Sequence, residues 1–176
     1  SILVVTRSRA AMNPVDADAD VSLAAGTVEL SDDDSGTSLF AIDNMVPDQP
    51  ERDCIVVSYD GNVLPVAVSL SSEAAGDLAA LLQVSVERGV GGTFHDCTGF
   101  TPSETVYEGT LASMATGRRG IEAFRVTDAP DAQTFRFTFT LTDVPAVSDD
   151  DGPDPSVPTA SARFVWPAEP VDEGDN

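Results

Sequence analysis

Hydrophobic and polar residues alternate most regularly in the stretch 134-TFRFTFTLTD-143. The apolar side chains that share one face of this stretch are Phe135, Phe137, Phe139 and Leu141. The other face is rich in threonine, which is the pattern of an antiparallel strand with one buried side. The stretch 159-TASARFVW-166 alternates in the same way. Because 148-SDDDGPDPSVP-158 favours turns, we expect these two strands to form a hairpin with a long acidic loop.

Shorter apolar stretches upstream are separated by turns that contain Asp, Gly, Asn or Pro, at the spacing of strands in a sandwich. The expected strands are 21–30, 38–43, 54–62, 64–72 and 82–89. Helical spacing occurs in 73–82 and 108–116. The pattern predicts an all-β fold, a jelly-roll β-sandwich with one or two short helices in its crossovers. We expect the sandwich domain to cover residues 21–166 and residues 167–176 to form an acidic disordered tail.

The composition fits one domain with a core, because 41% of the 176 residues are hydrophobic. The chain is strongly acidic: 30 Asp and Glu residues against 9 basic residues give a formal net charge of -21. A surface of this charge repels phosphate groups, which excludes nucleic acid and anionic lipid as partners. No apolar stretch approaches the length of about 18 residues that a membrane-spanning helix needs, so we expect no membrane span.

The two cysteines, Cys54 and Cys97, lie neither in a CxxC motif nor at a Cys/His metal-binding spacing. An isolated pair in a β-rich, lysine-free chain favours one disulfide, and with it an oxidising, extracellular location. The alternative is two buried free thiols in a cytosolic protein.

The sequence offers little catalytic chemistry. Its one histidine, His95, lies in 91-GGTFHDCTGF-100, and the chain has no GxSxG or HExxH motif. We therefore assign no catalytic residue and do not expect an enzyme, with a secreted hydrolase centred on His95 as the less favoured alternative. No cofactor fingerprint or phosphate-binding loop occurs, so no cofactor is expected.

Calcium is the metal that the aspartate runs would suit, because carboxylates are hard oxygen ligands. The candidate ligands are Asp149, Asp150, Asp151 and Asp154. Their run does not continue into the twelve-residue loop ending in Glu that an EF-hand requires. We favour a solvated acidic turn over a calcium site here.

The first seven residues, SILVVTR, have the composition of a strand. Its apolar side chains are Ile2, Leu3, Val4 and Val5. An unpaired strand of this kind is an aggregation hazard, so residues 1–7 need a sheet to join. They pair either with their own sheet or with that of a neighbouring molecule, by β-strand addition. Residues 8–20 have the composition of a tether, and a connection of this length tips the balance toward the neighbour.

Several motifs resemble the camelysin/TasA family of secreted biofilm matrix proteins. The stretch 25-AGTVELSDDDSGTSLFAIDNMVPDQPERDCIVVSYDGN-62 carries the family's AGT strand and a turn in which Asp48 replaces the usual Gly. The two C-terminal strands and the contexts 53-DCIVV-57 and 94-FHDCTGF-100 resemble actinobacterial members. The resemblance implies a jelly roll, secretion, and fibres in which an N-terminal segment is donated to the next subunit. By position, the donor is residues 1–7, although the segment ahead of Ala25 is longer and more apolar than the family's leader.

These observations together predict a secreted structural protein, the subunit of an extracellular filament or biofilm matrix fibre. Its partner is a further copy of itself, joined head to tail through the donated N-terminal strand. The main alternative is a monomeric secreted β-sandwich binding module in which the first strand folds back onto its own sheet.

Overall fold

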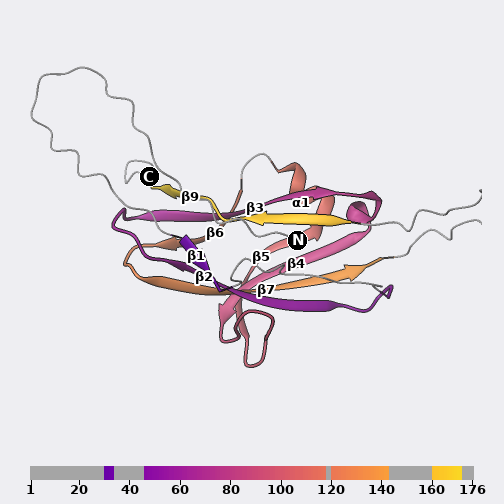
Figure 1. The fold of residues 1–176 in the computed structure, drawn as a ribbon, viewed down its shortest axis with the longest axis horizontal. Coiled ribbons are helices and arrows are strands. Elements are labelled where there is room, and N and C mark those ends of the chain that lie inside the picture. Colours follow the sequence, from indigo (N-terminus) through magenta and orange to yellow (C-terminus); the bar gives the residue numbers. More distant parts are fainter. Residues whose placement is uncertain (1–29, 34–45, 118–119, 143–159, 172–176) are drawn as a thin grey trace, which may run out of the picture.

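The alternating stretches form two antiparallel sheets that pack face to face (Figure 1). The computed structural model describes residues 30–33, 46–117, 120–142 and 160–171. The described part of the chain is therefore an all-β sandwich, as the alternation predicts. The finer jelly-roll assignment stays a prediction.

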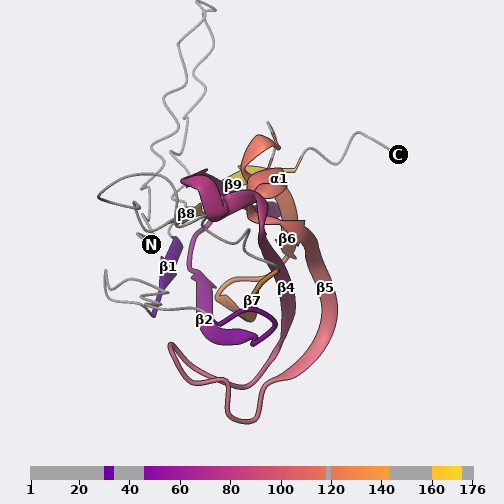
Figure 2. The ribbon, with the colours of Figure 1, turned by 90° about the vertical axis from the view of Figure 1, so that its right-hand side faces the viewer.

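The larger sheet has five strands in the order β1–β2–β7–β4–β5. These strands are β1 (Leu30–Asp32), β2 (Glu51–Tyr59), β4 (Leu82–Val90), β5 (Thr101–Thr110) and β7 (Asp131–Leu141). The strand with the clearest alternation, β7, lies in the middle and pairs with β2 on one side and β4 on the other. Figure 2 shows the strands of this sheet curving from β1 and β2 round to β5.

The smaller sheet is centred on β3 (Val66–Ala75), with β6 (Ile121–Val126) along one side. Along the other side lie β8 (Ser161–Val165) and β9 (Ala168–Pro170). Both short strands keep one register on β3, since Ala75 pairs with Ser161 and Val66 with Pro170. The Pro167 carbonyl accepts a hydrogen bond from the Ser69 N–H at 2.8 Å, so the ladder continues between them. Together β8 and β9 form one interrupted edge strand.

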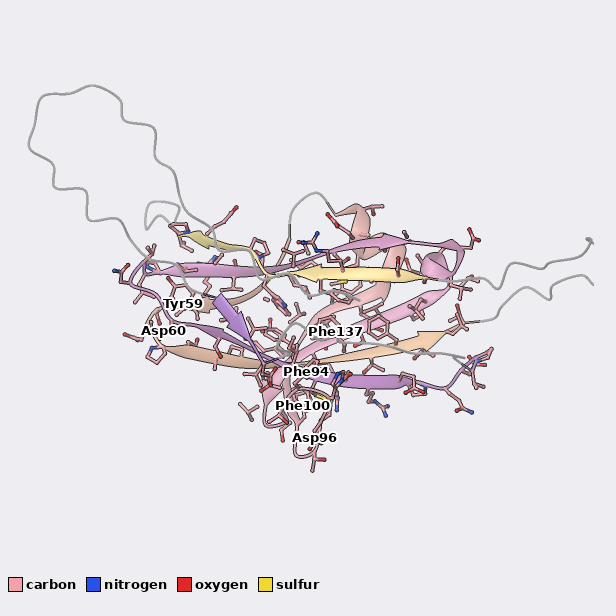
Figure 3. The ribbon with its side chains drawn as sticks, viewed as in Figure 1. Tyr59, Asp60, Phe94, Asp96, Phe100 and Phe137 are labelled. Atoms are coloured by element: carbon pink, nitrogen blue, oxygen red, sulfur yellow. A yellow bond between two sulfur atoms is a disulfide. The ribbon has the colours of Figure 1, made fainter. Side chains whose placement is uncertain are left out.

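The core lies between the sheets and is built around β7. Phe135 and Phe137 are completely buried. Their rings meet Trp166 and Phe164 from the smaller sheet, with centroids 4.6 Å apart for Phe135–Trp166 and 4.8 Å apart for Phe137–Phe164. Figure 3 shows Phe137 in this position between the two layers. The apolar faces predicted for the two C-terminal strands thus meet across the sandwich.

The hairpin expected from these two strands is wrong. Residues 131–141 form the central strand of the larger sheet, whereas residues 161–165 pair with β3 in the smaller one. Both sides of β7 are already occupied by β2 and β4, so β8 cannot pair with it. The chain passes from one sheet to the other between these strands, which therefore face each other as layers.

Three strands were not anticipated. They are β5, which is largely polar and exposed, the six-residue β6, and the short β9. Of the two expected helical segments, 108–116 contains α1 (Leu111–Thr116), which begins after the N-cap Thr110. The segment 73–82 instead begins with the end of β3 and has only a short 3₁₀ helix, η1 (Asp77–Ala80). The expected disordered tail starts too early, because residues 168–170 pair with β3.

We expect Phe137→Ala to lower the free energy of unfolding by about 3–5 kcal/mol, because it removes a buried ring that touches the opposite sheet. The matched control is Thr138→Ala, on the other face of the same strand, where the loss should be under about 1 kcal/mol. Urea unfolding followed by the fluorescence of Trp166 measures both. Equal losses would contradict this assignment of the core face.

Candidate functional site

The β8–β9 edge, the side of residues 162–168 that faces away from β3, is the first feature with a potential for binding. In an antiparallel pair, the backbone groups of alternate residues point to opposite sides of a strand. The backbone of Pro167 bonds to Ser69 of β3, and that of Val171 bonds to Pro65, directly before β3. The N–H and C=O groups of the even-numbered residues Ala162, Phe164, Trp166 and Ala168 therefore point outward. No other described strand pairs with this edge.

Polar atoms buried beside this edge also lack partners. Within the described part of the chain, three buried side-chain atoms make no hydrogen bond: Ser72 Oγ, Arg163 Nε and Trp166 Nε1. Ser72 lies directly across the β3–β8 ladder from Phe164. Since an unsatisfied buried polar atom costs about 1–3 kcal/mol, their location here marks the edge as the least satisfied part of the described fold.

The second feature is the loop between β4 and β5, residues 91–100. Figure 3 shows Asp96 and Phe100 on this loop, on the side of the larger sheet away from the smaller one. Cys97 of the loop forms the predicted disulfide with Cys54 of β2. Gly91 and Gly92 lead into the loop with φ of 82° and 80°, a backbone region that favours glycine. A side chain at Gly91 would also clash with the Gly99 carbonyl.

A histidine–carboxylate pair lies beside the disulfide. His95 Nδ1 hydrogen-bonds to Asp53 Oδ2, and Asp53 Oδ1 accepts from the Cys54 N–H at 3.0 Å. His95 also donates its own N–H to the Cys54 carbonyl at 3.1 Å. Burial raises the pKa of the Asp53 carboxyl above its ordinary value, and this effect outweighs the opposing hydrogen bonds and charge from His95.

A second carboxylate connects the same loop to β2. Asp33 Oδ1 accepts from the Val56 N–H, and its Oδ2 accepts from the Phe94 N–H, both at 2.8 Å. On the outer face of the sheet, Phe100 lies under the guanidinium of Arg136, 4.8 Å from the ring centroid. Arg136 is itself held by Glu87 at 2.6 Å. The loop is therefore attached to the sheet at several points.

The hydrogen bonds of His95 among the described residues attach the loop to β2. A carboxylate and the histidine that it orients supply two of the three members of a catalytic triad. Among the described residues, however, no hydroxyl group hydrogen-bonds to the histidine, whose bonds all lead to β2. The described residues also contain no group of three or more side chains suited to hold a metal ion.

The other residues predicted from the sequence lie outside the described part of the chain. They are the donor residues Ile2, Leu3, Val4 and Val5, the tether 8–20, and the candidate calcium ligands Asp149, Asp150, Asp151 and Asp154.

Sequence reasoning missed Asp33 and Asp53. Asp53 gave one signal, because it continues the inward-facing row of Ile55, Val57 and Tyr59 as a charged residue at an apolar position. Asp33 lies in an aspartate run and gave no such signal in the sequence. Neither position indicated that its partner would come from a loop far along the chain, 42 residues beyond Asp53 and 61 residues beyond Asp33.

The fold and the site define the class: an all-β sandwich protein with one disulfide in its described part. No family model matches the chain, and no curated protein matches it either. Neither helix of the described part has the length and apolar character needed to cross a membrane.

The raised pKa of Asp53 gives a pH dependence with a definite sign. The folded state holds this proton more tightly than the unfolded chain, so the contribution to stability is full below the ordinary Asp pKa. This contribution is lost as the pH rises through the raised pKa that Asp53 has in the folded state. We expect Asp53→Asn, which keeps the acceptor oxygen, to remove this slope and to change the stability at pH 7 by less than about 1 kcal/mol.

Urea unfolding between pH 3 and pH 7 tests this expectation, with the exposed Asp60→Asn as control. If Asp53→Asn lowers the free energy of unfolding more at pH 7 than at pH 4, the ionised pair of Asp53 with His95 outweighs the effect of burial instead.

Proposed function

We propose that the protein is a secreted structural subunit of an extracellular filament, a biofilm matrix fibre of the camelysin/TasA type. Subunits join head to tail when residues 1–7 of one copy add to the sheet of the next. The observation that carries the proposal is the β8–β9 edge, whose outward backbone groups have no partner among the described residues. The resemblance of the sequence motifs to that family supports the same assignment.

The β8–β9 edge suits an added strand in length and chemistry. Outward groups extend from Ala162 to Ala168, a length that matches the seven residues of the donor segment. Pro167 does not interrupt them, because its missing N–H faces β3. Pro170 removes an outward N–H and ends the edge. The apolar side chains of the donor would extend the buried row of Phe164 and Trp166.

The location proposed for the protein rests on its covalent chemistry. Disulfides form and persist in oxidising compartments, and the Cys54–Cys97 bond holds a loop whose residues are exposed or half-buried. The net charge of -21 keeps such a subunit apart from nucleic acid and anionic lipid.

The alternative is a monomeric secreted binding module in which residues 1–7 fill the β8–β9 edge of their own chain. The same edge supports this alternative, since a tether of thirteen residues spans up to roughly 40 Å. The two proposals differ in whether assembly depends on protein concentration.

We expect the full chain to form filaments in negative-stain micrographs, and a version without residues 1–9 to give folded monomers. The deletion removes the apolar strand and leaves the described sandwich untouched. Ser8→Ala, in the tether, is the matched control and should still form filaments. Monomers in all samples would mean that residues 1–7 are an ordinary first strand. Filaments in all samples would mean that residues 1–7 are not donated to the next subunit.

The acceptor side is tested by Ala162→Pro, which removes an outward N–H and leaves the ladder to β3 intact. We expect the free energy of unfolding of this variant to lie within about 1 kcal/mol of that of the parent, and we expect the variant to form no filaments. Ala162→Val keeps the N–H, and this variant should still form filaments. Filaments in the proline variant would place the acceptor elsewhere.

A further inference from the structure

The outer edge of β2 is a second place where a strand would add. Its residues Cys54 and Val56 direct their backbone groups away from β7, as their bonding partners show. In the described residues β1 covers only the other end of this strand, from Val57 to Tyr59. An edge of this kind is a template for another chain unless something blocks it.

Three outward groups of this edge are bonded, one of them directly to the disulfide-bonded loop and two to carboxylates that also bind the loop. The Cys54 N–H bonds to Asp53, whose other oxygen is bound to His95. The Cys54 carbonyl accepts the backbone N–H of His95. The Val56 N–H bonds to Asp33, whose other oxygen binds the Phe94 N–H. A strand that approached β2 here would have to displace all three bonds.

The loop does not take this position by intrinsic preference. A tight turn closed by mutual hydrogen bonds between Thr93 and Asp96 forces His95 to φ of 60°, which a non-glycine residue rarely adopts. Such a conformation persists where surrounding contacts determine it. Here the Cys54–Cys97 bond and Phe100 on Arg136 supply those contacts.

Two other edges of the described sandwich, those of β5 and β6, carry their own protection. The β5 edge has Pro102, Glu104 and Glu108, and its pairing with β4 is irregular at two places. In β6 the register shift leaves Ala123 out of the ladder, and its carbonyl accepts from Arg88 at 3.1 Å. Proline, charge and bulges are the usual means of discouraging edge pairing.

We propose that the loop of residues 91–100 is an edge guard: held by the disulfide, it closes the outer edge of β2 to strands of a second copy of this chain. The donated strand of a neighbouring copy adds to the β8–β9 edge instead. The second statement rests on the proposed function, whereas the closure of β2 does not.

Hydrogen exchange of the full chain, resolved by NMR, tests the closure. In Asp33→Ala, which leaves the disulfide intact, we expect the Val56 amide to exchange at least about fivefold faster. The Ile55 amide is the internal control, because it faces β7. Asp60→Ala, at the end of the same strand, should change neither amide. Unchanged exchange at Val56 in Asp33→Ala would overturn the edge guard.

The double variant Cys54→Ser/Cys97→Ser tests what the guard prevents. We expect the amides at positions 54 and 56 to accelerate at least about tenfold more than that of Ile55. In micrographs the variant should give laterally joined or irregular aggregates under conditions where the parent forms single filaments. Equal acceleration at all three positions, or filaments like those of the parent, would overturn the proposal.

The two proposals fail in different ways. A parent chain that forms no filaments contradicts the proposed function, while the exchange rates of Val56 and Ile55 still decide whether the loop closes β2.

Discussion

A strand at the edge of a sheet presents N–H and C=O groups that must find partners, and this constraint organises the molecule. Each sheet of a sandwich has two edges, and an unprotected edge invites other chains. In the described part of the protein, a loop closes the outer edge of β2, and Arg88 binds a carbonyl of β6. The β5 edge carries a proline and charged residues. Along β8 and β9, beside β3, no other described strand pairs with the outward groups.

That difference between edges depends on the core. The rings of Phe135 and Phe137 meet Trp166 and Phe164, so the strand that carries the unpaired edge is held by its side chains against the centre of the other sheet. The edge is therefore firmly placed, although Pro167 lacks the N–H for one bond of the ladder to β3. A preorganised edge binds an incoming strand with less loss of conformational freedom than a mobile one.

Local patterns predicted individual strands well and their partners poorly. The alternation of β7 fixed its buried face, because burial is a property of the strand's own residues. The hairpin with β8 failed, because pairing depends on which strands already occupy each side. The polar β5 escaped notice for a related reason: an exposed edge strand has no apolar face to reveal it. Of the site, the disulfide was predictable from two isolated cysteines, whereas its carboxylate neighbours required the fold.

Those carboxylates change how the acidity of this chain is understood. Aspartate runs were considered as calcium ligands, yet Asp33, from such a run, uses its two oxygens to join two backbone N–H groups of separate segments. Asp53 similarly joins the Cys54 N–H to His95. A carboxylate can do this because it offers two acceptor oxygens and no donor, which an edge rich in unpaired N–H groups needs. For these two residues the paired oxygens of one carboxyl group are a means of closing a sheet edge.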